Sequence, residues 1–266
     1  MKNRLDVYLV EQGYYKTRNK AKLAIENGDI LVNEKIITKA SYPVDETTKI
    51  KQVKESIPYV SRGGVKLAHA LDSFSVDVKD CICLDIGAST GGFSDCLLQR
   101  NAKKVYALDV GTNQIDPALK QNHKLISIEN TNFRNIDINE FKAYQINFIC
   151  ADVSFISLTY LFENVSKILN QDGIFVALIK PQFETNKKEH NKNGVVNNKK
   201  IHLKVITKII NEANNFGLYI NKLTPSPIKG EKSGNIEYLT LISFNSKNIN
   251  LQDISDIIEL AFKELR

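Results

Sequence analysis

The sequence predicts an α/β protein, with a small α/β module at residues 1–58 and a larger domain at residues 59–266. From residue 81 onward, short apolar runs alternate with segments whose apolar residues have helical spacing, as in a parallel sheet covered on both faces. Ahead of residue 59 the elements are shorter and basic residues cluster. A chain of 266 residues is long enough for one large and one small domain.

The N-terminal module is expected to contain helices and short strands. Leu5 and Leu9 start one apolar helix stripe, and Thr17 is placed to cap a second helix that stops at Gly28. The expected strands cover residues 30–32, 35–37 and 49–51. Asn33 and Glu34 form the expected tight turn between the first two strands. Residues 56–60 are the expected linker.

The larger domain is expected to contain seven strands. They cover residues 81–86, 105–110, 125–129, 147–151, 174–180, 218–224 and 238–244. Helical stretches separate the first five strands, which should therefore be parallel, whereas only a loop separates the last two, which should pair antiparallel. A final amphipathic helix closes the chain. Seven strands that end in a hairpin predict the Rossmann-like sheet of methyltransferases.

A glycine-rich turn, Asp85-Ile86-Gly87-Ala88-Ser89-Thr90-Gly91-Gly92-Phe93, joins the first of these strands to a helix. Glycines let the backbone pass close to a ligand, and the helix N-terminus can face a carboxylate such as the methionine tail of S-adenosylmethionine. Such a turn could also serve a dinucleotide, or hold no ligand. Asp109, at the end of the second strand, is placed for two ribose hydroxyls, and Asn132 for an adenine edge. Together they favour S-adenosylmethionine.

Four separated residues indicate the chemistry. Lys66 lies on a helix after the linker, Asp152 and Lys180 lie at strand ends, and Glu237 precedes the last strand. Two lysines and two carboxylates that converge beside a sulfonium cofactor suit methyl transfer to a ribose hydroxyl, whose proton must leave. The alternative is that these residues form surface ion pairs.

The charge of the chain suits a polyanionic partner. The net charge is +6, and the segment between Gln12 and Ile25 is basic and has no acidic residue. We expect this segment to contact RNA phosphates, or else to be a solvated helix face. Its basic residues are Lys16, Arg18, Lys20 and Lys22. Arg62 and Lys229 lie near Lys66 and Glu237 in the sequence, and they are further candidates for RNA contact.

Other residue types argue against several classes of protein. The four cysteines and four histidines lack metal-ligand spacing, so no metal is expected and the thiols should be buried and reduced. The N-terminus has no apolar signal region, and no run approaches the roughly 20 apolar residues that span a bilayer. These features predict a cytoplasmic protein that does not bind membranes.

Residues 85–93 closely resemble the glycine-rich turn of FtsJ-type RNA ribose methyltransferases. Further segments are similar to the TlyA family, which is also labelled haemolysin. They are residues 59–67, 108–111, 152–156, 179–184, 194–196, 226–230 and 234–238. The resemblance covers essentially the whole chain, including an N-terminal module that looks like the RNA-binding fold of ribosomal protein S4.

The resemblance implies S-adenosylmethionine-dependent 2′-O-methylation of cytidine in ribosomal RNA, in the large subunit and in some members also the small subunit. Lys66, Asp152, Lys180 and Glu237 match the catalytic tetrad of the FtsJ type. The implied cofactor contacts are Asp85, Gly87, Ser89, Gly91, Gly92, Phe93, Asp109, Asn132 and Asp152. One departure is Asn132, because FtsJ-type enzymes carry an aspartate there; an asparagine oxygen can still accept from the adenine amine.

Two other functions stay open at this point. One is a catalytically silent RNA-binding or ribosome-assembly factor, which a turnover assay would distinguish. The other is a cytolysin, although the sequence lacks an export signal and a strongly amphipathic lytic helix. For the leading function, the expected partners are ribosomal RNA or ribosomal subunits, and a monomer is expected.

Overall fold

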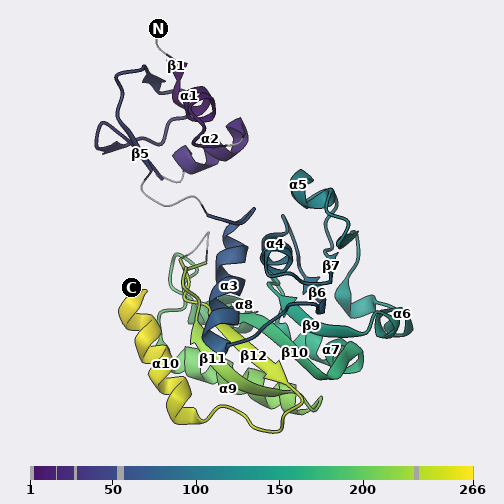
Figure 1. Ribbon diagram of the computed structural model, residues 1–266. Helices are drawn as coiled ribbons and strands as arrows, with labels where there is room; N and C mark the ends of the chain where they lie inside the picture. Colours follow the sequence, from purple (N-terminus) through teal and green to yellow (C-terminus); the bar gives the residue numbers. More distant parts are fainter. Residues whose placement is uncertain (1–2, 16, 27–28, 53–56, 231–233, 266) are drawn as a thin grey trace. The chain divides into compact units, whose positions relative to one another are not determined.

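The computed structural model describes residues 3–15, 17–26, 29–52, 57–230 and 234–265 (Figure 1). The chain divides into two compact units, Met1–Ile57 and Pro58–Arg266. Each unit has its own hydrophobic core.

The first unit packs two helices on small antiparallel sheets. The helices are α1 (Leu5–Glu11) and α2 (Arg18–Glu26). β2 (Ile30–Val32) lies between β3 (Lys35–Ile36) and β5 (Ile50–Gln52). A second pair, β1 (Asn3–Arg4) with β4 (Pro43–Val44), was not predicted, because two-residue strands carry too little alternation to be recognised. The core contains Leu5, Leu9, Ala21, Ile25, Ile30, Val32 and Val44.

Local signals in the first unit are confirmed where the structure describes them. The Thr17 hydroxyl accepts a hydrogen bond from the Lys20 amide at 3.3 Å, as expected of a helix cap. Asn33 and Glu34 have φ angles of 49° and 66°, which suits the tight turn predicted between β2 and β3. Gly28, the predicted stop of α2, lies outside the described residues.

The second unit is built on a seven-stranded sheet in the order β11-β12-β10-β9-β6-β7-β8. Its strands are β6 (Ile82–Ile86), β7 (Lys104–Leu108), β8 (Leu125–Ile128), β9 (Ile146–Ala151), β10 (Leu169–Ile179), β11 (Tyr219–Pro225) and β12 (Tyr238–Ser243). The first five are parallel, and β12 pairs antiparallel with both β10 and β11. The predicted sheet, including its final antiparallel pair, is therefore confirmed.

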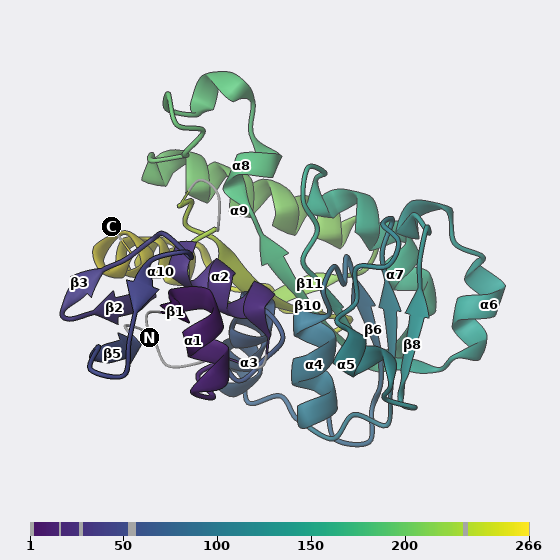
Figure 2. The ribbon, with the colours of Figure 1, turned by 90° about the horizontal axis from the view of Figure 1, so that it is seen from above.

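Helices cover both faces of this sheet (Figure 2). On one face, α3 (Arg62–Phe74) and α4 (Gly92–Gln99) share a core with β6, β9 and β10. On the other face lies a larger core that includes α6 (Ile138–Ala143), α7 (Phe162–Ile168), α9 (Lys199–Asn214) and α10 (Leu251–Glu264). Short elements complete the unit: α5 (Pro117–Lys120), α8 (Pro181–Glu184), η1 (Phe133–Asn135), η2 (Leu158–Leu161) and η3 (Lys187–Glu189).

One strand departs from its predicted extent. β10 begins at Leu169, five residues ahead of the expected start at residue 174, and its pairing with β9 shifts register between Leu169 and Ile174. The intervening residues are polar and end in Gly173, so they lack the apolar pattern on which the prediction depended. After this register shift, the carboxyl end of β10 lies beside that of β9. Ligands bind at this edge in open α/β sheets.

Candidate active site

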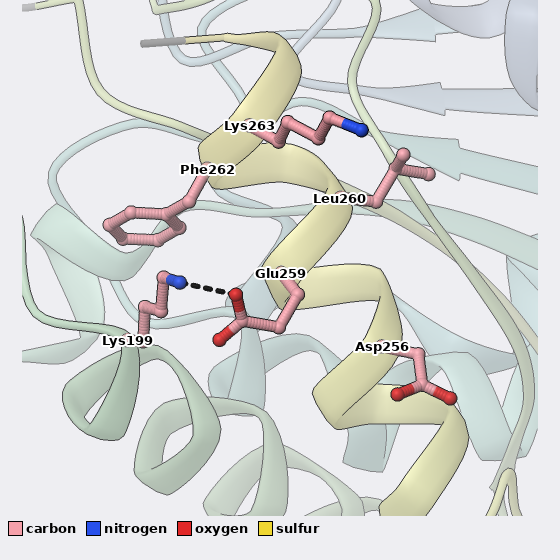
Figure 3. Close-up of a pocket in the computed structure, with 6 residues that line it drawn as sticks. All are labelled: Lys199, Asp256, Glu259, Leu260, Phe262 and Lys263. Atoms are coloured by element: carbon pink, nitrogen blue, oxygen red, sulfur yellow. Dashed lines mark hydrogen bonds and ion pairs between the residues drawn. The ribbon is translucent and has the colours of Figure 1, made fainter.

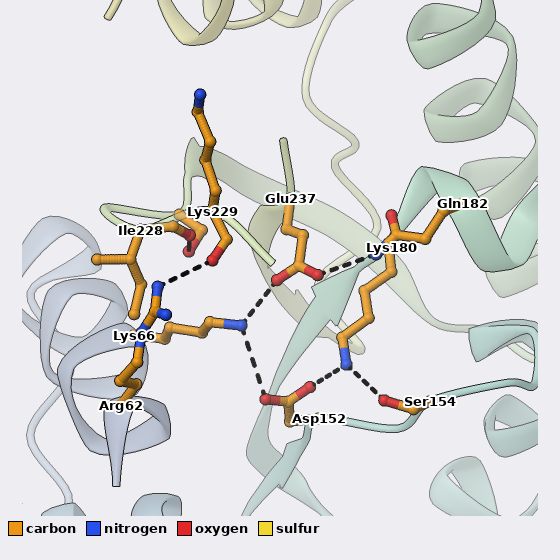
Figure 4. A network of polar contacts seen from close by, with 10 residues as sticks. Arg62, Lys66, Asp152, Ser154, Lys180, Gln182, Ile228, Lys229 and Glu237 are labelled. Atoms are coloured by element: carbon orange, nitrogen blue, oxygen red, sulfur yellow. Dashed lines mark hydrogen bonds and ion pairs between the residues drawn. The ribbon is translucent and has the colours of Figure 1, made fainter. Parts of the chain in front are cut away.

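Four charged side chains meet at the carboxyl edge of the sheet (Figure 4). Lys66 Nζ lies 2.7 Å from Glu237 Oε2 and 3.9 Å from Asp152 Oδ2. Lys180 Nζ lies 2.5 Å from Asp152 Oδ1 and donates to Ser154 Oγ at 3.0 Å. The structure therefore brings together the four residues that the sequence analysis proposed as a tetrad, in one continuous ion-pair network.

The sheet topology explains this convergence. Asp152 follows β9 and Lys180 follows β10, and these strands are parallel neighbours, so their carboxyl ends meet. β12 runs antiparallel to β10, and the register pairs Ile179 with Tyr238. Glu237, one residue before β12, therefore lies where β10 ends. Lys66 reaches the same edge of the sheet from α3, a helix that covers one face of the sheet.

The tetrad is only partly open to solvent. The side chains of Lys66 and Lys180 are each 10% exposed, that of Glu237 is 3% exposed, and that of Asp152 is 22% exposed. Charges at this depth require partners, and each of the four has at least one of opposite sign. The reading of these residues as surface ion pairs is therefore wrong.

The single helical turn α8 contacts both Glu237 and the segment that follows β9. Gln182 Nε2 donates to Glu237 Oε1 at 3.0 Å. Glu184 accepts hydrogen bonds from Ser157 Oγ at 2.6 Å and from the Leu158 amide at 2.7 Å. The sequence predicts no role for Gln182, Ser154 or Glu184, because their partners lie 26 to 55 residues away in the chain. Their only sequence signal was the similarity of residues 152–156 and 179–184 to family segments.

An aromatic pair beside the tetrad was also missed. Phe155 is 81% exposed and has a φ of 66°, a conformation that non-glycine residues rarely adopt. Its ring centroid lies 5.1 Å from that of Phe183, and Lys180 Nζ lies 5.6 Å from the Phe183 ring. A large apolar side chain held in solvent by a strained backbone indicates a binding role more than a packing role.

The glycine-rich turn has the geometry that close approach of a ligand requires. Gly87 and Gly91 have φ angles of 79° and 90°. A Cβ at Gly87 would lie 3.1 Å from the Asp152 carbonyl oxygen, so the turn passes directly behind the tetrad. Asp109 holds the turn from the next strand, accepting from the Ser89 amide at 2.8 Å and the Gly111 amide at 2.7 Å. Gly91 is the N-cap of α4, and because it has no side chain it accepts no hydrogen bond from the first amides of the helix through a side chain.

Three of the predicted cofactor contacts also have structural roles. Asp85 is buried beneath the turn, where Ser94 donates to its Oδ2 through both its amide and its hydroxyl. A Cβ at Gly92 would lie 2.1 Å from Ser61 Oγ, so this glycine is required where the starts of α3 and α4 approach each other. The Phe93 side chain is buried against Gly63, which leaves only its backbone near the turn.

Burial changes the protonation of Asp85. Desolvation raises its pKa to about 7, and the carboxylates of Asp152 and Asp109 add to the rise, against the lowering effect of the Ser94 hydrogen bonds. Oδ1 of Asp85 is buried without a hydrogen-bond partner among the described residues.

Asn132 lies at the N-cap of η1, where its Oδ1 accepts from the Arg134 amide at 3.0 Å. An amide oxygen has a second lone pair, and Nδ2 remains a donor, so this contact leaves Asn132 able to meet an adenine edge. With the glycine turn and Asp109, Asn132 forms a set of groups that fits S-adenosylmethionine: a backbone cradle, an acidic residue beside it and a polar side chain beyond.

Comparison with known proteins agrees with this geometry. Residues 59–244 match the FtsJ-like methyltransferase family, and residues 3–50 match the S4 domain. The 16S/23S rRNA (cytidine-2′-O)-methyltransferase TlyA of Mycobacterium tuberculosis is 32% identical over 263 residues, which are 98% of this chain and 97% of that protein. The chain belongs to the TlyA family of FtsJ-like methyltransferases. Its cofactor is accordingly S-adenosylmethionine.

Other relatives are also similar over most of their length. Hemolysin A of Brachyspira hyodysenteriae is 42% identical over 236 residues, covering 89% of this chain and 98% of that protein. A solved structure from Streptococcus thermophilus, which carries a hemolysin name, is 39% identical and has a TM-score of 0.79, covering 99% of this chain and 96% of that chain. Within the described residues, no helix of this TlyA-family protein is long and apolar enough to cross a bilayer.

The predicted RNA-contacting residues have mixed surroundings. Arg18 Nη2 lies 3.0 Å from Asp6, a buried carboxylate that Arg4 also binds. The hydrogen bond from Arg4, followed by that from Arg18, holds the pKa of Asp6 below its usual value. Part of the Arg18 guanidinium is therefore engaged within the unit, by an acidic residue twelve positions earlier. Lys16 lies outside the described residues.

The remaining candidates are exposed or lie beside the tetrad. Lys22 Nζ lies 3.7 Å from Glu26 in a pair whose side chains are 57% and 51% exposed, and Lys20 is also exposed. In the second unit, Arg62 Nη2 donates to the Lys229 carbonyl oxygen at 3.2 Å (Figure 4). That contact ties the start of α3 to the loop that leads into Glu237.

Two further features lie outside the tetrad. A pocket of about 480 Å³ lies between α9 and α10, where Lys199 pairs with Glu259 and lies 5.7 Å from the Phe262 ring (Figure 3). No tetrad residue lines it. His202 is buried between Tyr238 Oη and the Val196 carbonyl oxygen, each at 2.8 Å. Among the described residues, no group of three or more His, Cys, Asp or Glu is arranged to hold a metal ion.

Proposed function

We propose that this protein catalyses 2′-O-methylation of cytidine ribose in ribosomal RNA, with S-adenosylmethionine as methyl donor. The observation that carries the proposal is the largely buried network of Lys66, Asp152, Lys180 and Glu237 directly in front of the glycine-rich turn. Family membership supports the choice of substrate, because the Mycobacterium tuberculosis relative is named for cytidine-2′-O methylation of 16S and 23S rRNA.

In the proposed mechanism, Lys180 holds the 2′-oxygen of the target ribose and takes or relays its proton. Asp152 and Ser154 fix the Lys180 amine from two sides, at 2.5 Å and 3.0 Å. Glu237 holds Lys66, and Lys66 in turn faces Asp152. When bound, S-adenosylmethionine supplies the electrophilic methyl group. Alignment of the hydroxyl can contribute up to about 7–11 kcal/mol, and proton transfer about 10²–10⁴-fold in rate.

The cofactor groups that support this proposal are those around the turn. Gly87, Ser89 and Gly91 would present their backbone to S-adenosylmethionine, Asp109 would meet its ribose hydroxyls, and Asn132 its adenine edge. Asp152 would lie beside both the turn and the tetrad, because its carbonyl oxygen is close to Gly87. Asp85, Gly92 and the Phe93 side chain would support the turn from below.

RNA binding is assigned to two regions. We take residues 1–58 as the RNA-binding domain, since residues 3–50 match the S4 domain, and residues 59–266 as the methyltransferase domain. Lys20 and Lys22 are exposed on α2 and suit phosphate contacts. The exposed Phe155 ring packs on Phe183, which lies beside Lys180, and it suits stacking on a base. With ribosomal RNA as substrate, the reaction would take place in the cytoplasm.

Transfer of labelled methyl from S-adenosylmethionine to isolated ribosomal subunits that lack the modification tests the proposal. We expect wild type to yield a ribose-methylated cytidine, and Lys180→Ala to lose turnover by about 10²-fold or more while cofactor binding persists. Lys142→Ala, at an exposed lysine on α6, is the matched control and should retain turnover.

The same assay separates the alternatives. Cofactor binding without transfer to either subunit would contradict the proposal and favour a silent RNA-binding factor. Because one relative is named hemolysin A, lysis of red cells by the purified protein is a second readout. Lysis that is unaffected by Lys180→Ala would support a cytolysin instead.

A further inference from the structure

We infer that Gln182 is a positioning residue for the methyl-transfer site: its side-chain amide holds the Glu237 carboxylate in the orientation that binds Lys66. The inference rests on the proposed function of the tetrad and adds a residue to it. Gln182 Nε2 donates to Glu237 Oε1 at 3.0 Å, while Lys66 donates to Glu237 Oε2 at 2.7 Å. Each carboxylate oxygen thus has its own donor, and the two donors come from different elements, α8 and α3.

The chemistry of the pair determines how the amide is turned. A carboxylate only accepts hydrogen bonds, so Nε2 of Gln182 must face Glu237 and Oε1 must face away. Oε1 is then buried without a hydrogen-bond partner among the described residues. A buried acceptor without a partner is unfavourable and requires an explanation. This orientation of the amide leaves one hydrogen bond unmade, and it places the Glu237 carboxylate.

Packing around Glu237 leaves little room for another orientation. A Cβ on Gly230 would lie 2.7 Å from Glu237 Oε1, so the loop backbone closes the side of the carboxylate that Gln182 binds. The Arg62 contact with the Lys229 carbonyl oxygen holds that loop against α3. Without the Gln182 donor, Oε1 would be buried against this backbone without a hydrogen bond, and the carboxylate would be oriented less firmly toward Lys66.

The consequence reaches the reacting group through three ion pairs. Glu237 sets the position of Lys66, Lys66 faces Asp152 at 3.9 Å, and Asp152 contacts Lys180 at 2.5 Å. Loss of the Gln182 contact should therefore lower kcat while S-adenosylmethionine binding is retained, since none of the groups around the glycine turn bonds to Gln182.

Two substitutions distinguish a positioning role from general packing. Gln182→Met keeps the length of the side chain and removes the donor, so kcat should fall about tenfold or more at every pH. Gln182→Glu places two carboxyl groups in contact. When the pair holds a proton, the introduced carboxyl donates to Glu237 as the amide did; when the proton leaves, two negative charges repel. The kcat of Gln182→Glu relative to wild type should then fall by about tenfold or more from about pH 6 to about pH 9.

The charged groups on the elements around this pair are the same in all variants. They are Arg62 and Lys66 on α3, Asp152 after β9, Lys180 and Glu184 around α8, His190 after η3, Lys208 on α9, and Lys229 in the loop before β12. Expressing kcat relative to wild type at each pH cancels their titration. Gln252→Glu is the matched control, because Gln252 Nε2 donates to Asp256 Oδ1 at 2.9 Å on the exposed face of α10. Its ratio to wild type should not change with pH.

The outcomes are distinct. A ratio for Gln182→Glu that falls with rising pH, with cofactor affinity and the melting temperature Tm close to wild type at the lower pH, supports the inference. A ratio that is constant with pH, or a Gln182→Met variant with wild-type kcat, overturns it. Loss of cofactor binding in both variants overturns it as well, because that result indicates a general structural role. Wild type without transfer activity contradicts the proposed function, which is a separate result.

Discussion

Lys66 and Glu237 are separated by 171 residues in the chain, yet Lys66 Nζ donates to Glu237 Oε2 at 2.7 Å. Their side chains are 10% and 3% exposed, so neither charge has enough water to be stable without the other. The contact joins α3, which covers one face of the sheet, to the start of β12 within it. It therefore links the stability of the larger domain to the geometry of its candidate active site.

Breaking this pair should destabilise the protein strongly. Among the described residues, Lys66→Met leaves the buried Glu237 carboxylate with only the Gln182 amide as a partner, which should cost about 3–5 kcal/mol of unfolding free energy. Lys66→Met combined with Glu237→Met should cost less than the sum of the single changes, because no charge is then left unpaired. Urea unfolding of the three variants measures this coupling.

An exposed pair provides the comparison. Lys167 Nζ lies 2.6 Å from Glu163 Oε1 on α7, with side chains 46% and 60% exposed. The same double-mutant cycle there should give about 0.5 kcal/mol or less. If the coupling between Lys66 and Glu237 were equally small, the view that they form an interdependent buried pair would be wrong.

Stability should depend on pH through Asp85. Burial raises its pKa from 3.8 to about 7. Between these values the folded state holds a proton that the unfolded state has lost, so the free energy of unfolding contributed by Asp85 falls as the pH rises from about 4 to about 7. Asp85→Asn can keep both Ser94 hydrogen bonds but does not titrate. Relative to wild type it should therefore gain stability over that range, by at most on the order of 4 kcal/mol.

Urea unfolding of wild type and Asp85→Asn at several pH values between about 4 and about 8 measures this difference. Asp172→Asn, the same change at an exposed carboxyl, controls for the loss of one negative charge. A difference between wild type and Asp85→Asn that does not vary with pH would show that Asp85 is ionised in the folded protein.

The effect of a glycine-to-alanine change on S-adenosylmethionine binding should depend on the position of the glycine. Gly87→Ala introduces a Cβ at a φ of 79° and places it 3.1 Å from the Asp152 carbonyl oxygen. The backbone conformation alone costs about 1–2 kcal/mol, and displacement of the turn should weaken S-adenosylmethionine binding by about tenfold or more. Isothermal titration calorimetry and thermal unfolding measure the two effects separately.

Gly217→Ala is the matched control for the turn. Gly217 has a φ of 70°, but a Cβ there would meet no atom within 4 Å. This variant should lose stability through its backbone conformation and bind S-adenosylmethionine with wild-type affinity. Equal cofactor affinity in Gly87→Ala and Gly217→Ala would remove Gly87 from the cofactor site.

RNA affinity should depend on the exposed lysines of α2 through charge. Lys22→Gln removes one positive charge that Glu26 only partly offsets across 3.7 Å. If Lys22 contacts a phosphate, this change should weaken binding similarly for different RNA sequences and reduce the slope of log affinity against log salt by about one. Filter binding across a salt series measures the slope. Lys142→Gln on α6 is the control, and an identical slope change in both variants would mean a nonspecific charge effect.

The sequence alone was sufficient for the fold and for the identity of the candidate chemistry. Periodic apolar runs predicted the seven strands of the sheet and its antiparallel end, because strand pairing depends mainly on which residues can be buried. The glycines of residues 85–93 predicted a ligand-binding turn, since positive φ angles are a local property of the backbone. Similarity to family segments selected Lys66, Asp152, Lys180 and Glu237.

Only the tertiary structure decided which side chain contacts which. It showed that Gly92 and Phe93 serve helix packing, that Asp6 engages Arg18, and that Gln182 holds Glu237. It also exposed Phe155 beside the tetrad. The physical reason is range: backbone conformation and burial pattern are set by neighbouring residues, whereas ion pairs and amide contacts depend on where distant segments meet after the sheet and its helices have packed.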